Sequence, residues 1–125
     1  EVIEYYNTAD LYVHAANIEV ECMTALEAMA CGLPLLIADE ERSATKQFAL
    51  SEKFLFNTID ALTERINYWF ENRAELQQAK KDYLSFSRQF TIEDSYQKLV
   101  HSYHLALEMH QHKIEFPIYS QLQEA

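Results

Sequence analysis

The chain is short and strongly acidic. It has 125 residues, of which 49% are hydrophobic, so it can bury one core but hardly two. Its formal net charge is −10 at pH 7, and residues 1–50 alone hold nine acidic but only two basic side chains. Such a charge repels phosphate backbones and anionic lipids, which argues against a nucleic-acid partner and against direct membrane binding by this segment.

Apolar runs and cysteines indicate the compartment. No run approaches the roughly 20 apolar residues that span a bilayer, and the start has no basic-then-apolar signal pattern. The two cysteines, Cys22 and Cys31, lie on one expected helix and about half a turn out of phase, so they cannot bridge each other. We therefore expect buried, reduced cysteines and a cytoplasmic location.

The first elements alternate between helix and strand. A helix is expected to end near Asn7-Thr8, and the apolar, β-favouring run Leu11–Ala15 predicts a short buried strand. Residues 22–31 are good helix formers, and Gly32 supplies a C-terminal stop. Residues 33–38 then predict a second buried strand. A strand, a helix and a strand with short connections form the βαβ unit of a parallel sheet.

The later elements are mostly helical. Ser43 is expected to cap a short helix, Thr58 an amphipathic helix with Trp69 on its apolar face, and Thr91 a long final helix. The predicted order is a loop at 39–42, a helix from 44 to about 50, a short third strand at 53–56, helices at 59–70 and 74–86, and the long helix from 92. The expected fold class is α/β, a partial Rossmann-like parallel sheet with several covering helices.

The turn from the first strand into the helix near Cys22 is the expected binding place. In parallel α/β sheets ligands bind beyond the carboxyl ends of strands, where helix N-termini offer free N–H groups to anions. The amides of Cys22, Met23 and Thr24 can therefore receive a diphosphate. His14 closes the strand that points at this place, and it either contacts the donor or is buried with a backbone hydrogen bond.

Two carboxylates frame this turn. Glu19 precedes the helix, and Glu27 lies in its second turn on the face of Thr24. Carboxylates accept paired hydrogen bonds from vicinal hydroxyls, which suits a sugar or a ribose. Acids near a helix start are equally expected from the helix dipole alone. Spacing by itself does not decide whether the two carboxylates bind a sugar or only complement the helix dipole.

The stretch from Glu19 to Pro34 resembles a known family. It reads Glu-Val-Glu-Cys-Met-Thr-Ala-Leu-Glu-Ala-Met-Ala-Cys-Gly-Leu-Pro, which is similar to the Glu-x7-Glu signature of retaining GT-B glycosyltransferases, the group 1 glycosyltransferases. Residues 5–13 also resemble the helix and strand that lead into that family's site. The resemblance covers most of residues 1–110.

The resemblance implies residue roles. Glu19 would hold the donor sugar, which makes it the candidate catalytic residue, and Glu27 would hold the ribose. Family members use the backbone at the positions of Glu21, Cys22 and Met23 to touch sugar or diphosphate. This chain departs from the family there, since Val20-Glu21-Cys22 replaces Gly-Phe-Gly and makes the sugar pocket more acidic.

The resemblance also implies a reaction and the missing partners. The expected reaction moves a hexose from a nucleotide diphosphate sugar to an acceptor hydroxyl with retention, without a metal or other cofactor. Residues 1–112 would form the C-terminal part of the nucleotide-sugar-binding domain, and residues 113–125 a loosely ordered tail. An N-terminal acceptor domain and the upstream half of the donor domain would lie elsewhere, so the segment alone is not expected to turn over. The parent enzyme would act on cell-envelope glycoconjugates, peripheral to the inner face of the membrane.

Two other functions remain open from the sequence. One is a non-catalytic nucleotide-sugar binding module, and the other an acidic helical interaction domain in which Glu19 and Glu27 only complement a helix dipole. A sheet of two or three strands leaves an open edge. We therefore expect the isolated segment to fold marginally or to self-associate.

Overall fold

A computed structural model describes residues 1–111 of the chain, so the predicted tail at 113–125 lies outside the described residues. The chain divides into two compact units, Glu1–Gln89 and a second unit that starts at Phe90. The elements are α1 (Val2–Thr8), β1 (Tyr12–His14), α2 (Met23–Ala30), β2 (Leu35–Ala38), the 3-10 helices η1 (Ala44–Phe48) and η2 (Glu52–Phe54), β3 (Leu55–Phe56), α3 (Ile59–Glu71), α4 (Arg73–Ser87) and α5 (Ile92–Gln111). The assignment of residues 1–112 to one part-domain stays a prediction.

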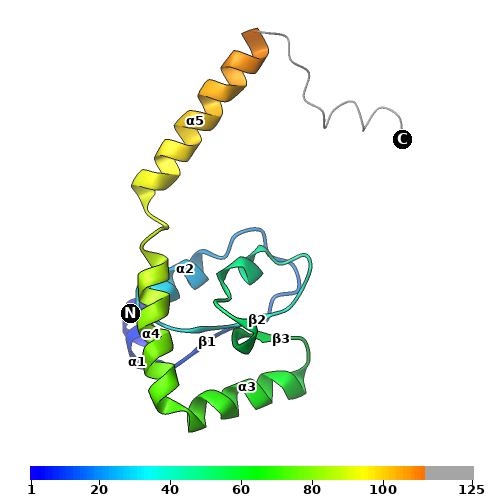
Figure 1. The fold of residues 1–125 in the computed structure, drawn as a ribbon, viewed down its shortest axis with the longest axis vertical. Coiled ribbons are helices and arrows are strands. Elements are labelled where there is room, and N and C mark those ends of the chain that lie inside the picture. Colours follow the sequence, from blue (N-terminus) through cyan, green and yellow to red (C-terminus); the bar gives the residue numbers. More distant parts are fainter. Residues whose placement is uncertain (112–125) are drawn as a thin grey trace, which may run out of the picture. The chain divides into compact units, whose positions relative to one another are not determined.

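The first unit is built on a parallel sheet with the order β1-β2-β3. Tyr12 pairs with Leu35 and His14 with Ile37, while Ala38 pairs with Phe56 on the other side of β2. The strands lie between α2 and α3, and α4 packs against both helices (Figure 1). All four residues of β2 are buried, as expected of a parallel strand covered on both faces. The predicted α/β fold class is confirmed.

The prediction that the first strand is buried is wrong for most of β1. Only His14 is buried, whereas the Val13 side chain is 42% exposed. The cause is position in the sheet, because β1 is an edge strand among the described residues and only β2 pairs with it. An edge strand keeps one row of backbone groups free to pair with another strand.

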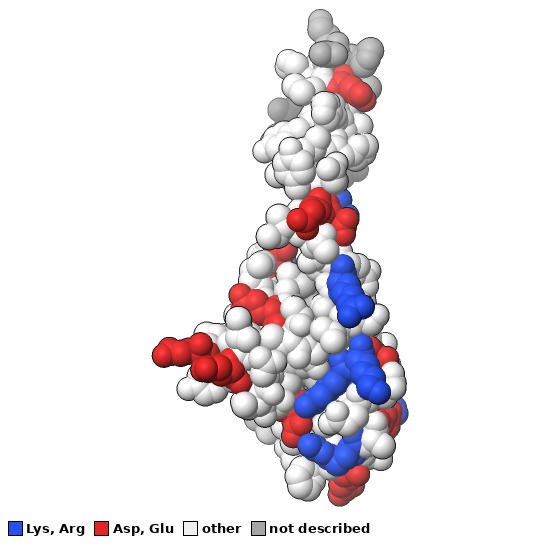
Figure 2. All heavy atoms as spheres, turned by 90° about the vertical axis from the view of Figure 1, so that its left-hand side faces the viewer, with Lys and Arg blue, Asp and Glu red and all other residues white. Residues whose placement is uncertain are grey.

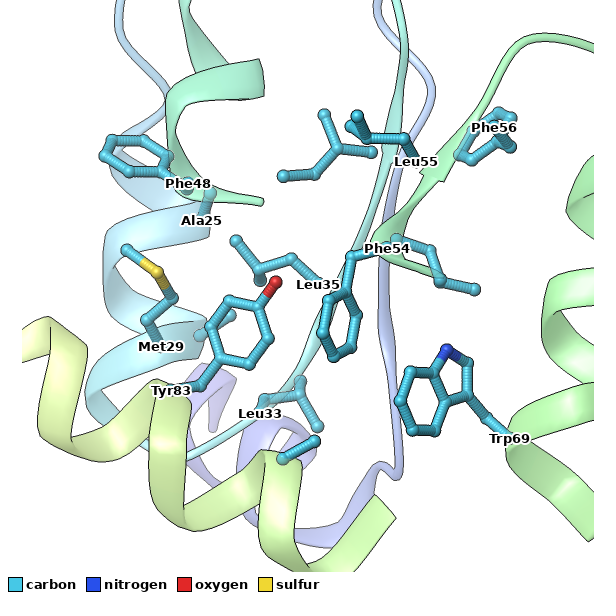
Figure 3. Packing of buried hydrophobic residues seen from close by; sticks show 14 of the residues in the cluster. Ala25, Met29, Leu33, Leu35, Phe48, Phe54, Leu55, Phe56, Trp69 and Tyr83 are labelled. Carbon is cyan, nitrogen blue, oxygen red and sulfur yellow. The ribbon is translucent and has the colours of Figure 1, made fainter. Parts of the chain in front are cut away.

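An aromatic cluster fills the core beneath α3 and α4. Phe54 stacks on Trp69 with ring centroids 4.8 Å apart, and its edge meets Tyr83 at 5.0 Å. Figure 3 shows Trp69 pointing toward the strands from one side and Met29 of α2 from the other. Trp69, Tyr83 and Met29 are all at most 1% exposed. These contacts fix α2 over the sheet, with its N-terminal end leading from the carboxyl end of β1.

The C-terminal end of α2 is closed by backbone hydrogen bonds. Gly32 takes a left-handed φ of 72° as predicted, and its N–H donates to Met29 O at 2.8 Å. The N–H of Leu33 donates to Ala28 O at 2.9 Å, which completes a Schellman motif. A Cβ at position 32 would lie 3.3 Å from the carbonyl oxygen of Lys80 in α4. Glycine therefore serves both the turn and the close packing of α2 on α4.

The predicted helix caps are confirmed in two of three cases. The Thr58 hydroxyl accepts from the N–H of Ala61, and that of Thr91 accepts from the N–H of Asp94, each at 3.0 Å. Ser43 precedes a short helix as predicted, but its hydroxyl makes no capping bond and the helix is of the 3-10 type. The N–H of Ala44, at the start of that helix, instead donates to the carbonyl of Glu19.

The second unit is described by α5 alone. Its apolar side chains Tyr96, Leu99, Tyr103 and Leu107 recur at helical spacing and are each more than half exposed. Across residues 1–111, none of the helices combines the length and the apolar character that crossing a membrane requires.

Candidate functional site

The loop between β1 and α2 is pinned over the carboxyl end of the sheet. The N–H of Glu19 donates to Arg42 O at 3.2 Å, and the N–H of Ala44 donates to Glu19 O at 2.8 Å. These bonds form a parallel bridge between Glu19 and Ser43. The loops that follow β1 and β2 are thereby joined, and Glu19 has a fixed backbone position.

The Glu19 carboxylate faces the end of β1. Its Oε1 accepts from the N–H of Val20 at 3.0 Å, and its Oε2 lies 3.9 Å from Nε2 of His14. The Glu19 side chain is 29% exposed, so one part of the carboxylate is open to solvent. His14 is buried, and its Nδ1 lies 3.5 Å from the Cys22 thiol. His14 is thus buried beside a thiol and not beside the expected backbone partner, and its contact with the donor stays a prediction.

The N-terminal end of α2 is open and uncapped. Cys22 is the N-cap residue in extended conformation, and its side chain makes no capping hydrogen bond. Met23 is 58% exposed and Val20 is 87% exposed, while Glu21 is exposed as well. The first amides of the helix therefore have no side-chain cap and carry the positive end of the helix dipole. This is a suitable place for an anionic group.

A short polar network lines this helix start. The hydroxyls of Tyr12 and Thr24 lie 2.6 Å apart, and the Thr24 hydroxyl lies 3.2 Å from the Cys22 sulfur. Tyr12 and His14 share one face of β1, where their rings stack with centroids 6.4 Å apart. Burial raises the pKa of the Tyr12 hydroxyl, although its hydrogen bond with Thr24 opposes the shift. The hydroxyl of Tyr12 thus stays protonated and able to donate.

Glu27 joins this network from the other side. The Tyr6 hydroxyl donates to Glu27 Oε2 at 3.4 Å, and the Tyr6 ring meets the Tyr12 ring edge to face at 6.2 Å. Burial and the Glu27 carboxylate both raise the pKa of Tyr6. Glu27 is thus linked through Tyr6 and Tyr12 to the start of α2, and Glu27 itself is exposed.

Sequence reasoning missed Tyr6 and Tyr12. Tyr12 had a usable signal, since it lies two residues before His14 on a strand and must share its face. Tyr6 had none, because it reaches Glu27 across 21 residues of sequence. The structure brings His14, Glu19, Cys22 and Thr24 together, and it places Glu21 and Met23 beside them as exposed residues.

The two basic side chains near the site differ in whether an ion pair already holds them. Lys46 forms an ion pair with Asp39, which raises the pKa of the lysine. Arg42 is exposed and lines an open hollow of about 380 Å³ together with Asn17, Ile18, Asp39, Glu40 and Glu41. Among the described residues, Arg42 has no ion pair, unlike Lys46, but three acidic residues share its hollow.

A second group of basic residues lies away from the site. Figure 2 shows basic side chains gathered along the side of the first unit that α4 occupies. Two of them are neutralised by Asp10, which accepts from Arg73 at 3.0 Å and from Lys80 at 2.9 Å. Asp10 precedes β1 whereas His14 ends it, so these basic residues lie toward the opposite end of that strand.

The family is decided by a comparison with protein-family models. The model of Glycosyl transferases group 1 matches residues 1–84, which include every candidate site residue. The chain belongs to the group 1 glycosyltransferase family. The predicted membership of the group 1 glycosyltransferases is thereby confirmed.

A solved glycosyltransferase has the same fold. The catalytic domain of cholesterol-alpha-glucosyltransferase from Helicobacter pylori is 39% identical in sequence and superposes with a TM-score of 0.68. The match covers 72% of this chain but only 58% of the solved one. The first unit therefore matches part of a GT-B glycosyltransferase domain. A comparison with curated proteins finds no match.

Proposed function

We propose that this glycosyltransferase chain binds the sugar and the ribose of a nucleotide diphosphate sugar. Glu19 accepts hydrogen bonds from the hydroxyls of the donor sugar, and Glu27 accepts those of the ribose. The diphosphate lies against the first amides of α2. One observation carries the proposal: the two carboxylates flank one open, uncapped helix start, Glu27 held by the Tyr6 hydroxyl and Glu19 lying beside His14.

The helix start supports this placement of the ligand. Uncapped N–H groups at a helix N-terminus attract an anion, and here they do so against the acidic charge of the surrounding side chains. Fixed amides aimed at the leaving diphosphate stabilise charge in the transition state without reorganising. Arg42 can add a charge-assisted contact from the adjoining hollow.

The proposed reaction is hexose transfer to an acceptor hydroxyl with retention of configuration. Glucose is the first sugar to test, because the solved relative is a glucosyltransferase. Transfer itself uses no metal in this proposal, and acceptor groups come from parts of the enzyme beyond this chain. We place the parent enzyme in the cytoplasm, with any membrane contact made through those other parts.

Titration calorimetry tests the donor site directly. The chain is titrated with UDP, GDP and ADP and with their glucose conjugates. We expect one of the three nucleotides to bind, and Glu27→Ala to weaken it by about 1.5–3 kcal/mol, roughly tenfold or more, because a charged acceptor is lost. Glu19→Ala should weaken only the extra affinity that the sugar contributes.

Glu64→Ala is the matched control. Glu64 is an exposed helical glutamate on α3, away from the start of α2, so its removal should leave nucleotide affinity unchanged. Equal affinities in Glu27→Ala and the wild type would remove the ribose assignment. Normal binding without any transfer, after the missing parts are supplied, would instead favour a non-catalytic module.

A further inference from the structure

Three side chains at the end of β1 form a compact set of metal-ligand atoms. His14 ends the strand, Glu19 lies in the pinned loop and Cys22 caps α2. One ligand atom from each lies within 4.8 Å of the other two. His14 and Cys22 are buried, whereas Glu19 is partly exposed, so the group has one face toward solvent.

The buried imidazole has an unmet bonding capacity. His14 is only 9% exposed, and its Nε2 has no hydrogen-bond partner. The nearest acid oxygen, Glu19 Oε2, is 3.9 Å away, which is too far for a hydrogen bond. A buried polar atom left without a partner destabilises the fold. A ligand between His14 and Glu19 would remove that cost.

The ligand chemistry selects zinc. A thiolate, an imidazole and a carboxylate together suit Zn²⁺ rather than Mg²⁺ or Ca²⁺, which prefer oxygen ligands. Bond lengths of about 2.0–2.3 Å in a tetrahedron put ligand atoms about 3.3–3.8 Å apart. His14 binds one ion through a single nitrogen, and with one atom from each residue the three ligand atoms lie within 4.8 Å of one another. Side-chain rotations that bring these atoms closer together would close the site.

The surroundings of the sulfur also suit a thiolate. The hydroxyl of Thr24 lies 3.2 Å from Sγ and that of Tyr12 lies 4.0 Å from it. One proton is used in the bond between the two hydroxyls, so the other hydroxyl proton is free to be donated toward a negative sulfur. Groups that hydrogen-bond to metal ligands orient them and tune their affinity.

We propose that His14, Glu19 and Cys22 form a Zn²⁺ site with an open fourth position for water. On binding, the Cys22 S–H bond breaks, the sulfur forms a bond to Zn²⁺ and the proton passes to the buffer. The thiolate and the carboxylate then balance the two positive charges of the ion. Because Glu19 also contacts the donor sugar in the proposed function, bound zinc excludes the sugar; this last step alone rests on that function.

Cobalt substitution gives the primary test. The reduced 125-residue chain is titrated with Co²⁺ alone, and the thiolate-to-cobalt charge-transfer absorption is followed. We expect one Co²⁺ per chain with this band and complete displacement by Zn²⁺. Calorimetry with Zn²⁺ in two buffers of different ionisation enthalpy should show about one proton released per ion. Absence of the band in the wild type would overturn the proposal.

Two cysteine variants and one histidine variant locate the site. Cys22→Ser should abolish the band, whereas Cys31→Ser should keep it, since Cys31 lies at the far end of α2. The double variant His101→Gln/His104→Gln on α5 should also keep it. A band that survives in Cys22→Ser places the metal elsewhere and refutes the site. Circular dichroism checks folding, and Glu19→Gln, at a partly exposed position, should lower Zn²⁺ affinity about tenfold or more even if Cys22→Ser misfolds.

The link to the donor is tested separately. Zn²⁺ at saturation should weaken the glucose conjugate of the bound nucleotide more than the nucleotide itself, and Cys22→Ser should lose this effect. If the band appears but no nucleotide binds at all, the zinc site stands and the proposed function fails. If nucleotides bind but the band is missing, the proposed function stands and the zinc site fails.

Discussion

The two ends of α2 have opposite characters, although eight residues make up the helix. The C-terminal end is buried against α4, closed by the Gly32 turn and packed around Met29. The N-terminal end is uncapped, exposed and surrounded by polar groups that include Cys22 and Thr24. A helix that is anchored at one end can leave amides at the other end free for a ligand. Stability and binding should therefore respond to different substitutions along one element.

The largest expected effect comes from the buried end. Met29→Ala should lower the free energy of unfolding by about 2–5 kcal/mol, because it removes a fully buried side chain and leaves a cavity. Urea denaturation followed by circular dichroism measures the loss. Met29→Leu keeps the volume and should cost less than about 1.5 kcal/mol. Equal losses in the two variants would show that packing at this end does not anchor α2.

Gly32 gives the next effect at the same end. Gly32→Ala should destabilise the chain by about 1–2 kcal/mol, since a Cβ is disfavoured at a φ of 72° and would press on the Lys80 carbonyl. The melting temperature reports the change. Cys31→Ala, one residue earlier at a φ of −86°, is the control and should cost clearly less. An unaltered melting temperature in Gly32→Ala would refute the role of the turn.

A substitution at the open end should act mainly on binding. Tyr12→Phe removes the hydroxyl that lies 2.6 Å from Thr24, and it should cost about 1 kcal/mol or less in stability because the contact is solvent-accessible. Donor affinity should fall about fivefold, because Thr24 at the helix start loses the hydrogen bond that orients it. Calorimetry and denaturation on one sample compare the two effects. Tyr5→Phe, on an exposed ring of α1, should change neither.

The smallest effect is expected at Asp10, away from both ends of α2. Hydrogen bonds from Lys80 and then Arg73 hold the pKa of Asp10 below its usual value of 3.8. The ion pairs therefore stabilise the fold fully above about pH 4, and this contribution is lost as the pH falls through the lowered pKa. Asp10 is half exposed, so Asp10→Asn should cost only about 0.5–1 kcal/mol. Unfolding measured from pH 2 to 6 should show the two proteins converging at the acid end.

The sequence predicted the elements well because their signals are local. The apolar run of β2, the stop at Gly32 and the cap at Thr58 each depend on neighbouring residues, and all were found. The exposure of Val13 was missed because it depends on which strands lie beside β1, and no local pattern encodes sheet order. Ser43 was misjudged for a similar reason, since a bond from Ala44 to Glu19 replaces the expected cap.

The candidate site was predictable only in part. The spacing of Glu19 and Glu27 placed both at the helix start, and His14 followed from the strand that it closes. The Tyr6 contact with Glu27 and the cluster of His14, Glu19 and Cys22 arise from tertiary packing, which brings residues of α1, β1 and α2 together. The spacing of residues along the sequence does not show which distant residues come into contact in the fold.

The bridge between Glu19 and Ser43 sets a rule for protein engineering. Residues 15–18 form a short span held at both ends, by β1 on one side and by the bridge on the other. Extra residues inserted within this span can form a longer loop without shifting Glu19. A deletion would instead strain the bridge that joins Glu19 to Ser43 in the loop after β2. Libraries that aim to change donor preference should therefore lengthen residues 15–18 and leave residues 42–44 untouched.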